Sequence, residues 1–177
     1  MEQLLSERQV GQALRKLRKV ISARIAGKCG VAVIGIRTRG ETLAQRLVAA
    51  LREEHPHQEI LHGVLDITFY RDDLSRRRGA PLVRATEIDF DLNDTWVLLV
   101  DDVLETGRSV RAALDAVHDF GRPRVVRLAV LVDRGGRELP IAADFVGRAV
   151  EAPRDHRVQL RLRENDGQEG VFLVPQT

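Results

Sequence analysis

Three short, almost continuously apolar segments constrain the fold of this chain more than any other feature. They are VAVIGI (31–36), WVLLV (96–100) and RVVRLAVLV (124–132). Apolar strands without alternation are typical of parallel sheets that are covered on both faces. We therefore expect an α/β fold with a mostly parallel central sheet flanked by helices.

Segments with helical periodicity separate these strands, as a parallel sheet requires. Residues 6–26 begin with a capping box, Ser6 to Gln9, and then place apolar residues at steps of three and four. The same periodicity predicts helices over residues 41–54 and 109–120. Alternating strands and helices therefore extend over most of the chain.

Two further strands and one loop complete the expected order of elements. Residues 61–70 and the alternating segment RVQLRLR (157–163) are expected to be strands. The stretch RDDLSRRRGAPLV (71–83) is too polar for the core and contains glycine and proline, so a long loop is expected there.

Length and composition place the chain among ordinary globular proteins. Its 177 residues are typical of one domain that buries a core. The net charge of +2 and the sequence pI of about 9.1 permit a polyanionic partner without requiring one. Cys29 is the only cysteine, which fits a reducing cytoplasm. No apolar run approaches the about 18 residues of a membrane span, and the N-terminal segment lacks the apolar core of a secretory signal.

Residues 98–110, LLVDDVLETGRSV, run from an apolar strand through two aspartates to the expected start of a helix. In a parallel sheet, ligands bind beyond the carboxyl ends of the strands, where residues 37–40 and 133–140 would also lie. A helix that starts after Gly107 offers backbone N–H groups to a phosphate. Asp101 and Asp102 offer acceptors for vicinal hydroxyls or a metal. The segment therefore predicts a ribose 5-phosphate site.

Two other phosphate-binding patterns do not match. A P-loop requires G-x-x-x-x-G-K-[ST], whereas Arg108 follows the single Gly107 here. A dinucleotide fold requires G-x-G-x-x-G, and GIRTRG (35–40) has a different spacing. In the remaining alternative, the aspartates merely end a strand and Thr106 caps a helix. A complete acid-acid-aliphatic-aliphatic-x-Thr-Gly-x-Ser run favours the ribose phosphate site over that alternative.

VLLVDDVLETGRSV (97–110) resembles the phosphoribosyl diphosphate (PRPP) motif of type I phosphoribosyltransferases. That motif alone marks only the superfamily. Blocks in the matching order narrow the resemblance to the family of bifunctional pyrimidine-operon regulatory proteins and uracil phosphoribosyltransferases, over roughly residues 8–150. These blocks are GIRTRG (35–40), LDITFYRDDLS (65–75), GRP (121–123) and LAVLVDRGGRELPIAADFVG (128–147).

The resemblance implies a type I phosphoribosyltransferase fold in a single domain over residues 1–177. A mobile flap is expected at about residues 71–84. A small hood is expected from about residues 133–150 together with the C-terminal tail.

The resemblance also implies roles for individual residues. Asp101 and Asp102 would bind the ribose hydroxyls, and the catalytic residues would be Arg39, Arg71 and Glu105. The 5-phosphate would be bound by Thr106, Gly107, Arg108 and Ser109. The diphosphate would be bound by Arg37, Thr38, Arg39 and Gly40, where two arginines around a threonine suit its charge. The base would lie under the hood, near Val132, Asp133 and Arg134. A basic surface turn is the simpler interpretation of residues 37–40 without the resemblance.

The implied reaction joins uracil to the ribosyl phosphate of PRPP and gives UMP and diphosphate. Mg²⁺ bound to PRPP oxygens would stabilise the leaving group together with Arg39 and flap arginines, without direct protein ligands to the metal. Flap closure would exclude water. A solvated charge run is the simpler interpretation of the three arginines at 76–78.

Glu105 departs from the family pattern, in which tyrosine is frequent at this position. Related 6-oxopurine phosphoribosyltransferases carry an acid there that is proposed as a general base. Glu105 would then manage the proton of the incoming base nitrogen, or it would be a solvated surface residue. It keeps a 6-oxopurine substrate as the alternative to uracil.

Binding of pyrimidine-operon messenger RNA in response to UMP is the second implied function. The candidate phosphate contacts are Arg15, Lys16, Lys19, Arg137 and Arg148. Amphipathic helices normally carry charge on the outside, and Ala142 stands where RNA-binding members tend to have a basic residue. A transferase without RNA regulation is therefore the alternative. The intact PRPP motif disfavours a purely regulatory protein, and a homo-oligomer, a dimer or larger, is expected.

Overall fold

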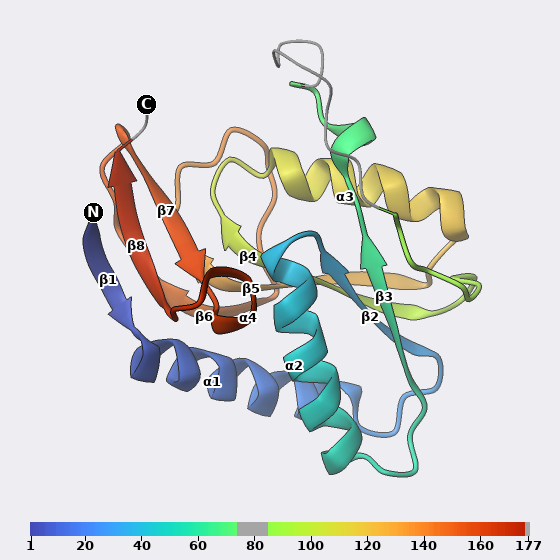
Figure 1. Cartoon of the computed structure of the whole chain (residues 1–177). Helices are drawn as coiled ribbons and strands as arrows, with labels where there is room; N and C mark the ends of the chain where they lie inside the picture. Colours follow the sequence, from blue (N-terminus) through green and yellow to red (C-terminus); the bar gives the residue numbers. More distant parts are fainter. Residues whose placement is uncertain (74–84, 176–177) are drawn as a thin grey trace.

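A computed structural model describes residues 1–73 and 85–175, and it confirms the expected parallel sheet (Figure 1). Five parallel strands lie in the order β3-β2-β4-β5-β6. Their bounds are β2 Val31–Ile36, β3 Ile60–Leu65, β4 Trp96–Leu104, β5 Val125–Asp133 and β6 Phe145–Ala149. The three apolar segments of the sequence are β2, β4 and β5, which occupy the middle of this sheet.

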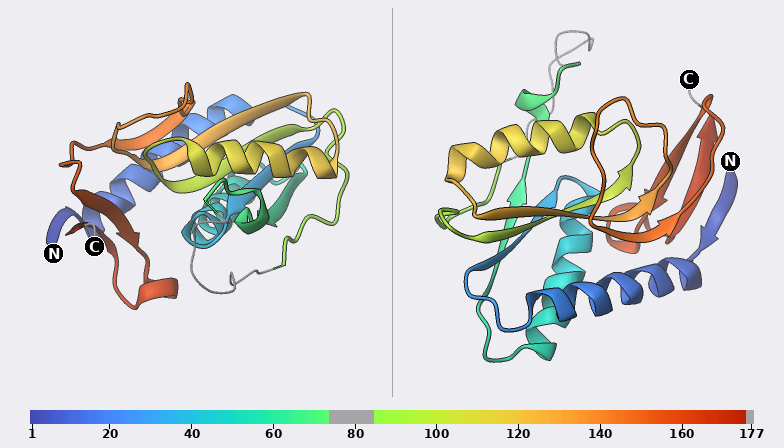
Figure 2. Two further views of the ribbon diagram at one scale, coloured as in Figure 1. Left: turned by 90° about the horizontal axis from the view of Figure 1, so that it is seen from above. Right: turned by 180° about the vertical axis from the view of Figure 1, so that it is seen from behind.

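Helices cover both faces of the main sheet (Figure 2). The helices α1 (Glu7–Ile25) and α2 (Arg39–Glu54) pack on one face, in a hydrophobic cluster that includes Leu17, Leu47 and Leu98. The helix α3 (Arg108–Val117) packs on the other face, in a cluster that includes Val110, Ala113 and Leu99. The capping box predicted at the start of α1 is present, with Ser6 as the N-cap.

A second sheet, here called the hood sheet, lies beside the main one (Figure 1). It is antiparallel in the order β1-β8-β7, from β1 (Glu2–Ser6), β8 (Gly170–Pro175) and β7 (His156–Arg161). A one-turn helix, α4 (Arg163–Asp166), connects β7 to β8. The buried residues of the hood sheet, Val158, Leu160 and Val171, join the cluster formed by α1 and α2. The hood sheet therefore shares a core with the main sheet.

The sequence placed residues 133–150 in the hood, whereas β6 within this range is an edge strand of the main sheet, parallel to β5. Residues 61–70 were expected to be one strand, but β3 ends at Leu65 and a short 3-10 helix, η1 (Thr68–Tyr70), follows. The side chain of Asp66 accepts hydrogen bonds from the backbone N–H and the hydroxyl of Thr68, and this turn ends the strand.

Most of the expected flap, residues 74–84, lies outside the described residues, and so do the three arginines at 76–78. The described part of it, Arg71 to Asp73, lies beside the start of α3, where Arg71 Nη1 is 3.5 Å from Ser109 Oγ. Within residues 1–73 and 85–175, no helix combines the length and the apolar character needed to cross a bilayer.

Candidate active site

The two aspartates of the sequence motif lie near the end of β4, in the middle of the main sheet. The Asp101 side chain is buried and Asp102 is half-buried. The backbone N–H of Asp102 donates to Asp101 Oδ1 at 2.9 Å, and that of Val103 donates to Asp102 Oδ1 at 2.8 Å. Burial raises the pKa of both carboxyls, and the Asp102 charge raises the pKa of Asp101 further. The two carboxylates therefore offer acceptor oxygens that are largely shielded from water, so that a ligand hydroxyl can bind them with little competition from solvent.

The loop after β4 leads directly into α3, as the motif predicts. Gly107 is the N-cap of α3 with φ 91°, a left-handed conformation that favours glycine. A Cβ atom at this position would lie 3.3 Å from Cβ of Ile141. The first turn of α3 therefore presents its backbone N–H groups beside the hydroxyls of Thr106 and Ser109, an arrangement suited to a phosphate.

Arg108 behaves differently from the other residues of this loop. Its guanidinium pairs with Asp72 at 2.6 Å and with Glu138 at 2.7 Å. It thereby joins the start of the flap to the loop after β5. The side chain is thus held by two carboxylates, and the backbone N–H of Arg108 donates to the hydroxyl oxygen of Thr106 at 3.3 Å.

Two cavities, of about 380 and about 370 Å³, meet at the aspartate pair. The first extends over residues 104–109 and reaches β7 of the hood sheet. The second extends over the loop between β2 and α2 and the turn that follows β3. Both cavities are lined by Arg39, Arg71, Asp101, Asp102, Val103 and Ser109. The aspartate pair therefore contributes to both cavities.

The predicted diphosphate loop lines the second cavity with Arg37, Thr38 and Arg39, and its Arg37–Thr38 peptide bond is cis. Gly40 allows α2 to start against β4, because a Cβ atom there would lie 2.5 Å from the carbonyl oxygen of Val100 and 3.1 Å from Cα of Asp101. This close approach places the loop between β2 and α2 beside Asp101 and Asp102.

Both arginines of that loop are paired with carboxylates. Arg37 contacts Glu41 at 3.2 Å and Glu87 at 2.6 Å. Arg39 contacts Asp166 of α4 through Nε at 3.1 Å and through Nη2 at 2.6 Å. The sequence predicted that these side chains lie at the site, and it gave no indication of these partners.

The residues expected to contact the base lie apart from the cavities. None of Val132, Asp133 and Arg134 is among the residues that line either cavity in the described part of the chain. The buried Arg134 side chain instead donates to the backbone carbonyls of Ala152, Pro153 and His156. Its role in this structure is to hold the segment that leads into β7.

Glu105 lines the first cavity, but its carboxylate is not isolated. Arg134 Nη1 lies 3.3 Å from Glu105 Oε1. Neither interpretation from the sequence, a general base or a solvated surface acid, included this ion pair. This ion pair connects the loop after β4 to the segment after β5.

The candidate RNA contacts fall into two groups. Arg15, Lys16 and Lys19 are exposed on α1, which packs on β6, where Arg148 is exposed. Lys16 Nζ lies 3.4 Å from the carbonyl oxygen of Gly147, next to Arg148. Lys16 and Arg148 therefore share one surface, although α1 and β6 are distant in the sequence. Arg15 lies on the side of α1 that faces α2, beside Arg46 and Leu47.

Arg137 does not belong to that surface. It donates to the carbonyl oxygens of Ile141 and Glu105, each within 2.9 Å, and pairs with Asp133 at 2.5 Å. Arg137 therefore does not present an unpaired charge at the surface in this structure, and its part in RNA binding stays a prediction. The side chain braces the loop after β5 against the phosphate loop.

Two groups that line the cavities were not predicted from the sequence. One is the turn after β3, with Asp66, Ile67 and Thr68, which was hidden because the strand was expected to run on to residue 70. The other is Arg157, Val158 and Gln159 of β7. Alternation predicted this strand, but nothing local to it indicates which segment it faces.

Comparison with known proteins places this site in a family. Residues 1–159 match the model of the phosphoribosyl transferase domain family. The chain is 53% identical to a protein of Roseiflexus sp. (strain RS-1) named Bifunctional protein PyrR, over 99% of this chain and 96% of that protein. It is 49% identical to the protein of that name from Deinococcus radiodurans, over 96% and 92%.

Solved structures show the same fold at lower identity. The hypoxanthine phosphoribosyltransferase of Trypanosoma cruzi superposes with a TM-score of 0.71 at 15% identity, over 100% of this chain and 98% of that one. An enzyme of that name from Staphylococcus aureus gives 0.68 at 16% identity, over 99% and 91%. The sequence resemblance is thus confirmed: the chain belongs to the phosphoribosyltransferases and, within them, to the PyrR family.

Proposed function

We propose that this protein transfers the ribosyl phosphate of PRPP to uracil, with UMP and diphosphate as products. The observation that carries the proposal is the aspartate pair between two cavities, with a phosphate-type helix start on one side and an arginine loop on the other. This order matches a ribose that carries a 5-phosphate and a diphosphate.

In the proposed complex, Asp101 and Asp102 accept hydrogen bonds from the ribose hydroxyls. The backbone N–H groups at the start of α3, with the hydroxyls of Thr106 and Ser109, bind the 5-phosphate. Arg39 faces the diphosphate, where it stabilises the negative charge that develops as the bond from C1 to oxygen breaks. Arg71, from the start of the flap, lines both cavities and supports the same charge.

The residues present fit magnesium that arrives with PRPP. Within the described residues, no group of three or more histidine, cysteine, aspartate or glutamate side chains forms a metal site. The carboxylates of Asp101 and Asp102 line both cavities, where they would hold water bound to the ion, and PRPP oxygens and water would be its main ligands. When bound, the ion neutralises charge on the leaving group.

The base is proposed to lie on the side of the first cavity that β7 lines, where Val158 offers an apolar contact and Gln159 offers both an amide donor and an acceptor. A glutamine amide matches an imide edge such as that of uracil. The Glu105–Arg134 pair disfavours Glu105 as the base that removes a proton, so a 6-oxopurine substrate is the weaker candidate.

The experiment is a base-by-base assay with PRPP and magnesium that compares uracil, hypoxanthine, guanine and orotate. We expect turnover of uracil to exceed that of the other three. Turnover of hypoxanthine or guanine well above that of uracil would reject the proposed substrate.

The exposed cations of α1 and β6 favour a second proposed function, UMP-responsive binding of pyrimidine-operon messenger RNA. Phosphate contacts from Arg15, Lys16, Lys19 and Arg148 would supply the affinity. A homo-oligomer would place two such surfaces on one particle.

A further inference from the structure

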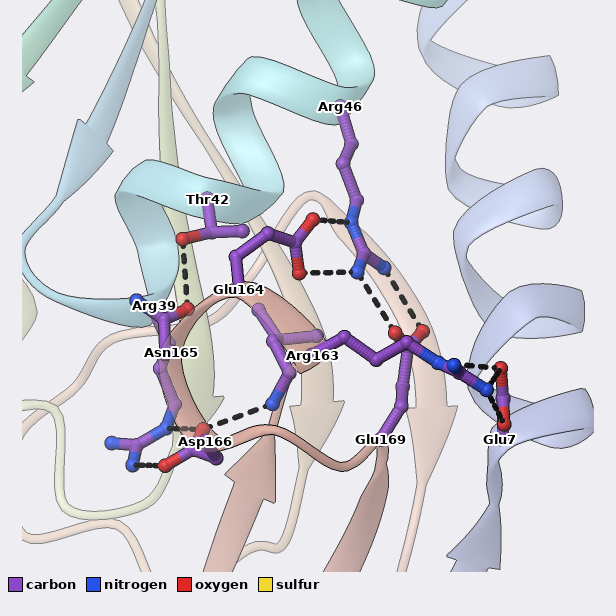
Figure 3. Close-up of polar contacts among 10 residues, drawn as sticks. Glu7, Arg39, Thr42, Arg46, Arg163, Glu164, Asn165, Asp166 and Glu169 are labelled. Carbon is purple, nitrogen blue, oxygen red and sulfur yellow. Dashed lines mark hydrogen bonds and ion pairs between the residues drawn. The ribbon is translucent and has the colours of Figure 1, made fainter.

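Side chains of the turn between β7 and β8 form hydrogen bonds with three residues in the first half of α2 (Figure 3). Asp166 binds Arg39 through both of its carboxylate oxygens. Thr42 donates its hydroxyl to Asn165 Oδ1 at 2.8 Å. Glu164 accepts from Arg46 at 2.9 and 2.7 Å. A segment from the end of the chain is thereby fixed to the helix that follows the diphosphate loop.

This turn is held in place independently of Arg39. Arg46 also donates to Glu169, whose side chain is largely buried, at 2.9 and 2.8 Å. Arg163 pairs with Glu7 at the start of α1 (Figure 3). The backbone N–H of Leu162 donates to Asp166 Oδ2 at 2.9 Å. The Asp166 carboxylate is therefore a fixed point against which a side chain can be aligned.

The bond to Asp166 leaves part of the Arg39 guanidinium available. A guanidinium has five N–H donors, and Asp166 takes those on Nε and one on Nη2. Among residues 1–73 and 85–175, Arg39 Nη1 has no hydrogen-bond partner, and Arg39 lines both cavities beside the aspartate pair. The hydrogen bond with Arg39 also lowers the pKa of Asp166, so the carboxylate stays ionised at neutral pH.

We propose that Asp166 is a positioning residue of the transferase, which aligns Arg39 so that its Nη1 edge faces the diphosphate. A long arginine side chain that is fixed before binding loses less rotamer freedom when it binds a phosphate. The inference rests on the proposed role of Arg39 as a diphosphate ligand. It gives α4 a part in the reaction, although α4 contributes no residue that lines either cavity.

The test compares Asp166→Asn with Glu164→Gln in the full chain. Asparagine keeps the size of residue 166 and an oxygen for the Leu162 N–H, but it loses the charge and the paired acceptors. Glu164→Gln neutralises a neighbouring carboxylate of the same turn, and its partner Arg46 retains Glu169. Any general loosening of the turn should therefore appear in both variants.

We expect Asp166→Asn to weaken the binding of PRPP and of inorganic diphosphate by about five- to twentyfold, and to raise the KM for PRPP by a similar factor. The affinity for UMP and the KM for uracil should stay within about twofold, because neither ligand reaches the diphosphate loop. Glu164→Gln should leave all five quantities within about twofold. Tighter or unchanged binding of diphosphate in Asp166→Asn, or an equal loss for UMP, would overturn the proposal.

An Arg39→Ala arm separates this inference from the proposed function. Loss of diphosphate affinity in Arg39→Ala with none in Asp166→Asn rejects only the positioning role. Unchanged diphosphate affinity in Arg39→Ala rejects the diphosphate loop itself. In the Arg39→Ala background, Asp166→Asn should have no further effect on diphosphate binding, as two coupled residues require.

Discussion

At the scale of single residues, the buried carboxyl of Asp101 is expected to lower the stability of the fold while it serves the proposed ribose site. Burial and the neighbouring Asp102 charge raise its pKa above that of an unfolded aspartate. Since the folded pKa is raised, the protonated carboxyl adds stability in acid, and this contribution is lost as the pH rises through the folded pKa. At a pH above the folded pKa the ionised carboxylate therefore costs stability, and in the proposed complex the same charge binds the ribose.

Asp101→Asn should consequently raise the free energy of unfolding at pH 7, because the amide has no charge to bury. The gain should shrink towards zero as the pH is lowered to about 4, the pKa of an unfolded aspartate. Chemical denaturation at a series of pH values measures both effects. A variant that is less stable than the wild type at pH 7 would show that the carboxylate is not the strained group.

The same substitution should reduce the transferase activity. A hydrogen bond to a charged group is worth about 1.5–3 kcal/mol, so kcat/KM for PRPP should fall by roughly ten- to two-hundredfold. Steady-state kinetics with saturating uracil provide the measurement. Wild-type kcat/KM in Asp101→Asn would remove Asp101 from the ribose site.

At the scale of elements, the sequence predicted those that carry their own signal. The middle strands β2, β4 and β5 are long apolar runs, and the three long helices show clear periodicity. The strand β1, EQLLS, is short and half polar, and its partner β8 begins at Gly170. Strand formation depends on packing against such a partner, which a local window of sequence does not contain.

The candidate site divides in the same way. The PRPP motif could be predicted because its chemistry depends on a single strand, loop and helix start. The contribution of β7 and the grip of Asp166 on Arg39 could not, because both depend on how a distant hairpin lies over the main sheet. Arg37, Arg108 and Arg137 were identified as cations, but ion pairing is a property of the folded arrangement.

The surface shared by α1 and β6 is the element on which RNA binding should depend. Lys16→Ala combined with Arg148→Ala should weaken binding of pyrimidine leader RNA and reduce the slope of log affinity against log salt by about 1–2. Uracil transfer should be unchanged, because neither residue lines a cavity among the described residues.

Filter binding with leader RNA and a scrambled control, each with and without UMP, provides the measurement. Arg122→Ala combined with Arg124→Ala is the matched control, since it removes two exposed cations that lie just before the start of β5. Equal losses in both double variants would indicate a generic basic surface. Affinity that UMP leaves unmoved would reject the regulatory function.

At the scale of the whole molecule, the site should couple ligand binding to stability. PRPP with magnesium at one hundred times its Kd should stabilise the protein by about 2.7 kcal/mol. For a chain of this size, that corresponds to a rise in Tm of roughly 5–11 °C. Thermal unfolding over a series of PRPP concentrations measures the shift. The double substitution of Asp101 and Asp102 to asparagine should abolish most of it, and a Tm in the wild type that does not respond to PRPP would contradict the proposed site.

The pairing of β1 with β8 also has a consequence for biosynthesis. The register joins Glu2 to Leu173, so β1 is synthesised long before the strand with which it pairs. At about 5–20 residues per second, β1 waits roughly ten to thirty seconds for its partner. The hairpin that carries Gln159 and Asp166 is completed at the same moment, because β8 is the middle strand of the hood sheet. A product that stops before residue 170 leaves β1 and β7 with unpaired edges, which proteases and chaperones recognise. Gln159 and Asp166 therefore take their places beside the main sheet only after β8 has been made.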